Sequence, residues 1–226
     1  MGSVADNLES VRERIARAAA RVGRDPREVK LVAVSKGRSV EEILEAARAG
    51  QRVFGENRAQ ELRDKLQQVE LELEWHFVGH LQRNKVNMVV GKAALIHSVD
   101  SLRLAEAIAS RAGEMGVEQD ILLQVNVSGE ESKYGAGEAE VAALLERVLE
   151  LTALRGRGLM TIAPLLEDEE EARPYFRRLR ELRDSLAEGY PEADLGILSM
   201  GMTQDFEVAV EEGANMVRVG TAIFAA

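Results

Sequence analysis

The sequence alternates short apolar runs with longer amphipathic stretches, and this alternation restricts its fold more than any other feature. The apolar runs occupy residues 30–35, 52–56, 74–79, 94–99, 121–127, 156–162, 195–200 and 215–220. Strands that alternate with helices form parallel sheets, and eight repeats in 226 residues approach the roughly 250 residues of a typical TIM barrel. We therefore expect an α/β fold, a single (β/α)8 TIM barrel over residues 1–226, ahead of an open doubly wound sheet.

An extra helix is expected before the first strand, because Leu8, Val11, Ile15, Ala18 and Val22 recur at three- and four-residue steps. After the last apolar run only "TAIFAA" follows, which is too short for a usual closing helix. We expect the N-terminal helix to cover barrel surface that a longer C-terminal helix would otherwise help to cover.

Composition excludes several classes of function. The chain has 39 acidic and 29 basic residues, and its net charge of −10 disfavours nucleic acids and anionic membranes as partners. The absence of Cys excludes disulfides and thiolate metal sites, and the three His do not form a metal-binding pattern, so no metal is expected. Because no signal-peptide pattern and no apolar run of membrane-spanning length occur, we expect a soluble cytoplasmic protein.

Two Gly-containing segments follow the last two predicted strands. In a TIM barrel the loops after strands seven and eight often hold phosphate. "SMGMT" places Ser199 at the end of the seventh run and Gly201 just after it, and "GTA" places Gly220 at the end of the eighth run and Thr221 just after it. Hydroxyl groups and approachable backbone N–H groups near helix starts suit an anion. Such turns also end many strands without a ligand, so the joint placement of the two segments carries the prediction of a phosphate site.

A lysine stands at the end of the first apolar run, in "LVAVSK". Lys36 shares the strand alternation of Val32 and Val34, so we expect it to point to the same side as they do. A lysine in partly desolvated surroundings has a lowered pKa and attacks carbonyl groups. The pattern therefore predicts a Schiff-base nucleophile at Lys36, whereas Lys85 and Lys133 fall in loops where solvated side chains are expected.

Arg218 lies inside the last apolar run, where a guanidinium is costly to bury without a partner. It is either a rim arginine hydrogen-bonded to a carboxylate or a donor aimed at a ligand. Asn57, His76 and Asn126 would add polar groups near the barrel mouth, although a structural role is the simpler interpretation of His76. A phosphate site opposite a nucleophilic lysine suits a phosphorylated aldehyde, either pyridoxal 5′-phosphate (PLP) or a sugar phosphate.

These residues occur within a set of short motifs. They are "AVSK" at 33–36, "FGEN" at 54–57, "WHFVGHLQRNK" at 75–85, "QVN" at 124–126, "ESKYG" at 131–135, "GLM" at 158–160, "LSMGMTQD" at 198–205 and "MVRVGTAIF" at 216–224. Together they resemble the YggS/PROSC family of pyridoxal phosphate homeostasis proteins, from about residue 6 to the C-terminus. The resemblance implies a barrel like the N-terminal domain of alanine racemase that binds PLP and works in vitamin B6 and amino-acid homeostasis.

The resemblance also implies roles for single positions. Lys36 would form the internal aldimine with PLP, and Arg218 would face the pyridine nitrogen. The other matching positions are Ser199, Gly201, Gly220 and Thr221 around the phosphate and Asn57 and His76 near the cofactor. The sequence departs from the family pattern where "SKGRS" replaces "SKTKP" or similar, and at His80, where a proline is expected. Both departures concern the shape of the mouth and access to it.

Three functions remain open, and a non-catalytic one is favoured. Arginine only donates hydrogen bonds, so Arg218 would leave the pyridine nitrogen unprotonated and weaken the ring as an electron sink. The first hypothesis is a monomeric PLP carrier that yields the cofactor to PLP-dependent enzymes through transient contacts. We therefore expect that this protein is not an enzyme.

The second hypothesis is a PLP-dependent racemase or decarboxylase. Racemisation needs an acid or base on each face of the substrate. In two-domain racemases, the resemblance implies, a tyrosine from the partner subunit's second domain supplies one. No such domain is expected here, and Tyr134, Tyr175 and Tyr190 do not lie in an analogous segment. The third hypothesis is a Schiff-base aldolase that acts on sugar phosphates without PLP.

Overall fold

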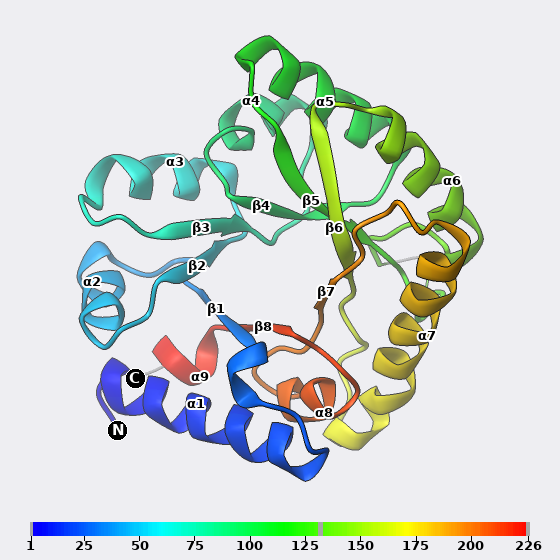
Figure 1. Ribbon diagram of the computed structural model, residues 1–226. Coiled ribbons are helices and arrows are strands. Elements are labelled where there is room, and N and C mark those ends of the chain that lie inside the picture. The colour runs from blue at the N-terminus through cyan, green and yellow to red at the C-terminus, as the bar shows by residue number, and fades with distance from the viewer. Residues whose placement is uncertain (1, 131–132, 225–226) are drawn as a thin grey trace.

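Eight parallel strands form a closed barrel in sequence order (Figure 1). The computed structural model describes residues 2–130 and 133–224, so two residues of the "ESKYG" motif and the last two of "TAIFAA" lie outside it. The strands are β1 Lys30–Val34, β2 Val53–Glu56, β3 Glu74–Phe77, β4 Leu95–Val99, β5 Gln119–Gln124, β6 Leu154–Met160, β7 Ile197–Ser199 and β8 Met216–Val219. Pairing of β8 with β1 closes the barrel and sets Arg218 opposite Val32. The predicted TIM barrel is confirmed.

Helices surround the strands on the outside (Figure 1). They are α1 Val4–Arg21, α2 Val40–Arg48, α3 Ala59–Gln68, α4 Val86–Val89, α5 Leu102–Met115, α6 Glu138–Glu150, α7 Arg173–Gly189, α8 Phe206–Glu211 and α9 Thr221–Phe224. Short 3-10 helices span Pro26–Glu28, Arg83–Lys85 and Glu169–Ala172. Within the described residues, no helix combines the length and the apolar composition needed to cross a membrane.

Local sequence fixes where the helices begin and end. Ser39 caps α2, since its hydroxyl accepts from the Glu42 N–H while the Glu42 carboxylate accepts from the Ser39 N–H at 2.8 Å. The helix therefore begins at Val40, five residues after Ser35, which leaves a short turn between β1 and α2. At the other end of a helix, Gly116 ends α5 with a φ of 66°, a conformation that suits glycine.

Helix α1 fills the position next to the short last helix. Leu8, Val11 and Ile15 are buried, as the periodicity predicts, but Val22 is 44% exposed because it lies just beyond the helix end. The helix packs against α2, α8 and α9, and the Asn7 amide donates to the carbonyl oxygen of Ile223 at 3.0 Å. The expectation that α1 covers surface beside a short C-terminal helix is confirmed.

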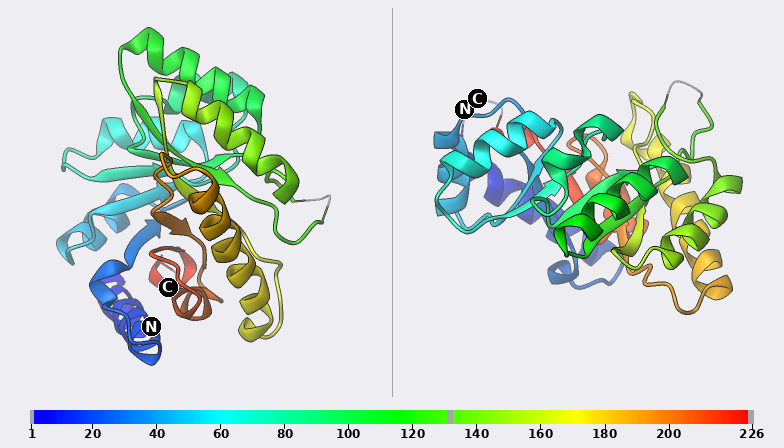
Figure 2. Two further views of the ribbon diagram at one scale, coloured as in Figure 1. Left: turned by 45° about the vertical axis from the view of Figure 1, so that its right-hand side comes forward. Right: turned by 90° about the horizontal axis from the view of Figure 1, so that it is seen from above.

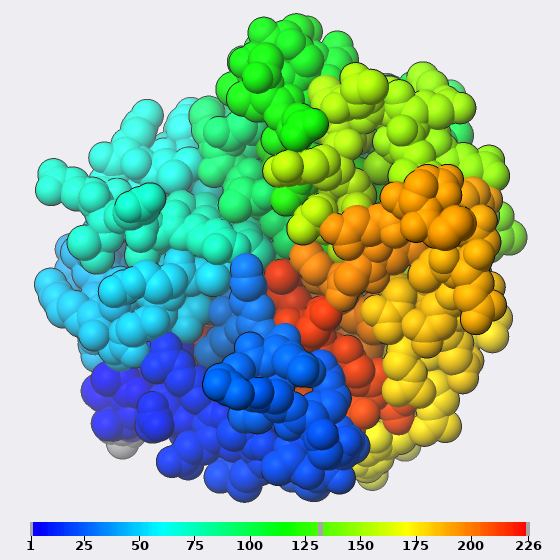
Figure 3. All heavy atoms as spheres, in the orientation of Figure 1, coloured from blue at the N-terminus to red at the C-terminus, as the bar shows by residue number. Residues whose placement is uncertain are grey.

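The views agree on this arrangement of the chain's two ends. Helices α1 and α9 lie side by side in Figures 1 and 2. On the face shown in Figure 3, blue N-terminal residues border red C-terminal ones near the centre. The first and last helices thus form one side of the barrel wall together.

Apolar side chains form two layers, one on each side of the strands. The larger layer lies between the strands and the helices. The smaller layer fills the barrel and consists of Val32, Val53, Val78, Leu95, Leu122, Met160 and Met216. Polar side chains, among them those of His76, His97, Ser199 and Arg218, are also buried and occupy strand positions of the same parity as this inner layer.

We predict that Leu8→Ala lowers the free energy of unfolding by about 2–5 kcal/mol, because it opens a cavity under a fully buried side chain. Denaturant unfolding would measure the change. Glu9→Ala, on the exposed side of the same helix, is the matched control and should have little effect. Equal stabilities for the two variants would contradict a packing role of α1.

Candidate functional site

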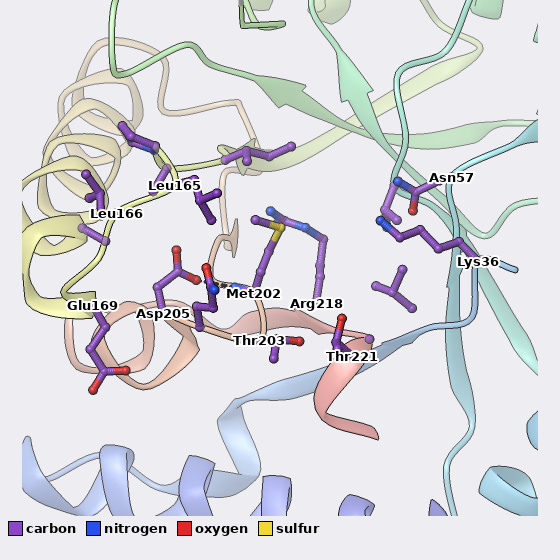
Figure 4. A pocket seen from close by; sticks show the side chains of 18 of the residues that line it. Lys36, Asn57, Leu165, Leu166, Glu169, Met202, Thr203, Asp205, Arg218 and Thr221 are labelled. Carbon is purple, nitrogen blue, oxygen red and sulfur yellow. Dashed lines mark hydrogen bonds between the residues drawn. The ribbon is translucent and has the colours of Figure 1, made fainter. Parts of the chain in front are cut away.

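A cavity of about 1000 Å³ opens at the carboxyl ends of the strands. Its walls come from the β1–α2 turn, the end of β2, the segment after β6, the β7–α8 loop and the start of α9. In Figure 4, Lys36 and Asn57 lie on one side, Arg218 lies near the centre, and Thr203 and Thr221 lie below it. The predicted nucleophile and the predicted buried arginine therefore face one cavity.

Lys36 lines the cavity from a turn and not from a strand. Strand β1 ends at Val34, and the Lys36 side chain is exposed. Lys36 lines the same cavity as Val34, so it points to the expected side, but the expected partly desolvated surroundings are wrong because the side chain is exposed. The chain leaves the strand at Ser35, whose hydroxyl donates to the buried Glu56 carboxylate at 2.5 Å.

A buried ion pair between Lys65 and Glu56 holds the turn that contains Lys36. The Lys65 ammonium donates to the Ser35 carbonyl oxygen at 2.6 Å and to Glu56 Oε1 at 2.6 Å. On the outer side, Glu61 accepts from the Gly37 N–H at 2.7 Å. Burial raises the pKa of Glu56, against the hydrogen bonds from Lys65 and Ser35 that lower it. Both neighbours of Lys36 are thus held by side chains from β2 and α3.

Arg218 is 4% exposed, and its guanidinium has two neutral partners. One nitrogen donates to Ser199 Oγ at 2.6 Å, and the other donates to the carbonyl oxygen of Thr161 at 2.8 Å. Burial lowers the pKa of Arg218 to about 10, while the charge of Asp205 acts in the opposite direction. The alternative of a rim arginine hydrogen-bonded to a carboxylate is wrong, since neither partner is a carboxylate. The side chain also lines the cavity (Figure 4).

Ser199 and His76 lie beneath the cavity and do not line it. Ser199 is fully buried, and its hydroxyl contacts His97 Nδ1 at 2.9 Å as well as Arg218. His76 contacts His97 at 2.9 Å and Glu74 at 2.7 Å. The Ser199 hydroxyl, which was expected at the phosphate, thus forms hydrogen bonds with buried side chains. Both ring nitrogens of His76 have hydrogen-bond partners, which agrees with a structural role.

The two loops predicted for phosphate do meet. Gly201 has a φ of +92°, and a Cβ there would lie 2.6 Å from the Ala209 Cβ, so only glycine lets this loop pack on α8. The Thr203 hydroxyl accepts from the Ala222 N–H at 3.4 Å and thereby links the β7–α8 loop to α9. Thr203, Gly220 and Thr221 all line the cavity.

Asn57 also lines the cavity, and its Oδ1 atom is buried without a hydrogen-bond partner among the described residues. A buried acceptor without a partner is uncommon and indicates a place for a ligand. Asn126 does not line the cavity. Its amide donates to the Glu130 carbonyl oxygen at 2.9 Å and accepts from the Gly129 N–H, so it shapes its own loop.

Two further side chains differ from their expected setting. Lys133, expected to be solvated, lines the cavity with its ammonium 3.2 Å from Glu130. His80 stacks on Tyr134 with 3.8 Å between ring centroids and lies 3.5 Å from Asp100. His80, one departure from the family pattern, therefore contacts Tyr134 and Asp100. In the other departure, "SKGRS", Gly37 adopts a φ of +68° beside Lys36.

Comparison with known proteins places this geometry in a family. The alanine racemase N-terminal domain matches residues 7–226. The chain is 49% identical to the pyridoxal phosphate homeostasis protein of Aquifex aeolicus, over 97% of this chain and 96% of that one. It is 42% identical to the protein of the same name from Escherichia coli, over 100% and 97%. The chain belongs to the pyridoxal phosphate homeostasis protein family.

Solved structures of similar proteins share the barrel. PipY of Synechococcus elongatus, whose structure has PLP bound, is 38% identical with a TM-score of 0.87, over 98% of this chain and all of that one (100%). Alanine racemase from Corynebacterium glutamicum is 15% identical with a TM-score of 0.70, and the match covers 99% of this chain but 61% of the racemase. The second similarity concerns the fold alone.

The sequence did not reveal the buried side chains that hold the cavity-lining residues in place. The Glu56–Lys65 pair and the role of His97 carry no local signal, because their partners come from different strands and helices. Thr203 was not among the residues expected around the phosphate, although it lies in the same "SMGMT" segment as Gly201. A hydroxyl two residues further along that loop is the signal that could have identified it.

We predict that Lys65→Met lowers the free energy of unfolding by about 3–5 kcal/mol near neutral pH, because it leaves the buried Glu56 without its cation. The loss should shrink as the pH falls from about 7 to about 4, since a protonated Glu56 needs no cation and its pKa in the folded state is raised. Lys92→Met, on the surface, is the control. Urea unfolding at both pH values would measure this, and a loss that grows towards acid pH would contradict it.

Proposed function

We propose that this chain binds PLP, holds it reversibly as a Schiff base on Lys36 and serves PLP homeostasis, without substantial catalytic turnover. The observation that carries the proposal is that Lys36 and Arg218 line one cavity, Lys36 at its side and Arg218 near its centre. Relatives at 42–49% identity are named pyridoxal phosphate homeostasis proteins, and PipY has PLP bound.

The residues present fit the cofactor. When bound, PLP would supply an aldehyde with which a lysine amine condenses, releasing water. Val34 and Val78 offer apolar wall for a ring, and the unpaired Asn57 Oδ1 marks a polar position beside Lys36. The cavity volume of about 1000 Å³ accommodates a ligand of this size.

Thr203, Gly220 and Thr221 would hold the phosphate. They line the cavity at the meeting point of the two loops, and their hydroxyl and backbone groups suit an anion. Gly201 would act by letting the loop approach α8. Ser199 would act on the site through Arg218 and not on the phosphate.

Arg218 would donate to the pyridine nitrogen. Because its pKa of about 10 still lies above neutral pH, the guanidinium stays charged and can only donate. The nitrogen would then remain unprotonated, and the ring would be a weak electron sink. A site of this kind suits storage and transfer better than carbanion chemistry.

The exposure of Lys36 suits a carrier. A linkage on an exposed lysine is accessible to water and to the amine of an acceptor, and both are needed for release. Delivery would involve transient contact between a monomeric carrier and PLP-dependent enzymes in the cytoplasm.

We predict that Lys36→Ala abolishes the absorption band of covalently bound PLP while the barrel stays folded, because Lys36 lies in an exposed turn. Absorption spectra before and after borohydride reduction, with mass mapping of the modified lysine, would measure this. Lys133→Ala changes another lysine of the same cavity and should keep the band. A band that persists in Lys36→Ala and maps to Lys133 would refute the assignment.

We also predict negligible racemisation of alanine by the PLP-loaded protein. Among the described residues that line the cavity there is no tyrosine or histidine to serve the face opposite Lys36. Tyr134 is 60% exposed and stacks on His80, and Tyr190 donates to Glu146. Robust turnover in a coupled D-alanine assay, retained through purification, would show that the chain is an enzyme.

A further inference from the structure

A continuous line of hydrogen bonds runs through the otherwise apolar barrel interior. Arg218 contacts Ser199 at 2.6 Å, and Ser199 contacts His97 at 2.9 Å. His97 contacts His76 at 2.9 Å, and His76 contacts Glu74 at 2.7 Å. The line starts at the cavity and ends at the first residue of β3, at the opposite end of the barrel.

The two ends of the line determine its direction. Arginine only donates and a carboxylate only accepts, so each group between them must accept from the Arg218 side and donate towards Glu74. Ser199 therefore donates to His97 Nδ1, and His97 donates from Nε2 to His76 Nδ1. His76 donates from Nε2 to Glu74. If both histidines are neutral, each therefore carries its proton on Nε2.

The titration behaviour of these groups agrees with this assignment. Burial lowers the pKa of His97 and of His76, so both stay neutral near neutral pH. The hydrogen bond from His76 lowers the pKa of Glu74 to about 2, and Lys30 adds an ion pair at 3.1 Å. Glu74 thus stays ionised and keeps accepting.

We propose that Glu74 is a positioning residue for Arg218, acting through His76, His97 and Ser199 to keep the guanidinium directed into the cavity. Hydrogen bonds aligned in one direction polarise one another. In this line every hydrogen bond has its donor on the side towards Arg218 and its acceptor on the side towards Glu74, so all of them point from the guanidinium towards the carboxylate. The alternative, reversed direction would give Ser199 two donors and leave its own proton without an acceptor in the line. The expected effect on PLP binding rests on the proposed function, in which Arg218 meets the PLP pyridine nitrogen.

The first test uses the protein without PLP. In ¹⁵N-labelled protein, two-dimensional NMR should show His76 and His97 as neutral Nε2–H tautomers near neutral pH, with slow exchange of the Arg218 guanidinium protons. Glu74→Gln removes the charge and offers an amide that both donates and accepts, so these protons should exchange faster. Glu72→Gln, an exposed glutamate two residues earlier, is the matched control and should match the wild type.

The second test measures PLP binding. Glu74→Gln should weaken PLP binding about tenfold, equivalent to about 1.4 kcal/mol, while Glu72→Gln leaves it unchanged. The Glu74 side chain is 39% exposed, so the variant should fold, and thermal unfolding would verify this. If it does not fold, Ser199→Ala interrupts the line next to Arg218 and should give the same two effects.

Two results would overturn the inference. One is a wild type in which either histidine is charged or protonated on Nδ1. The other is a folded Glu74→Gln protein whose guanidinium exchange and PLP affinity equal those of Glu72→Gln. A wild type that takes up no PLP refutes the proposed function instead, and the histidine tautomers and arginine exchange still decide whether Glu74 positions Arg218.

Discussion

The burial of one guanidinium is the constraint on which the interior of this barrel depends. Arg218 is 4% exposed inside a core of Val, Leu and Met side chains, where an unpaired charge would be strongly unfavourable. The inner positions of β3, β4 and β7 therefore carry His76, His97 and Ser199 in place of further apolar residues. This polar line lets a charged donor stand in the floor of the cavity.

Barrel closure brings the two ends of the chain to one site. Lys36 follows the first strand and Arg218 lies in the last, and only the pairing of β1 with β8 makes these strands neighbours. The same closure brings α1 beside α9. The cavity therefore exists only in the closed barrel, and α1 contributes to it directly through Arg14.

The fold was largely predictable and the site only in part, for a physical reason. Hydrophobic periodicity is local, so it located the eight strands and the buried face of α1. Strand ends also brought Lys36 and Arg218 to one rim. Strand alternation could not reveal that the chain turns away at Ser35, because Glu56 on β2 and Lys65 on α3 cause that turn. The contacts of the Ser199 hydroxyl were not predictable for the same reason, since its partners lie on β4 and β8.

The contrast between a buried Arg218 and an exposed Lys36 has a consequence for the chemistry of the site. PLP enzymes gain from an electron-poor ring and from a substrate sequestered from water. Here the group that would meet the ring nitrogen is an arginine, which can only donate, and Lys36 stands in an accessible turn. Both features weaken carbanion chemistry and favour exchange of the bound aldehyde. The properties of Lys36 and Arg218, the two residues that would bind PLP, thus also favour a function in which PLP is bound and later released.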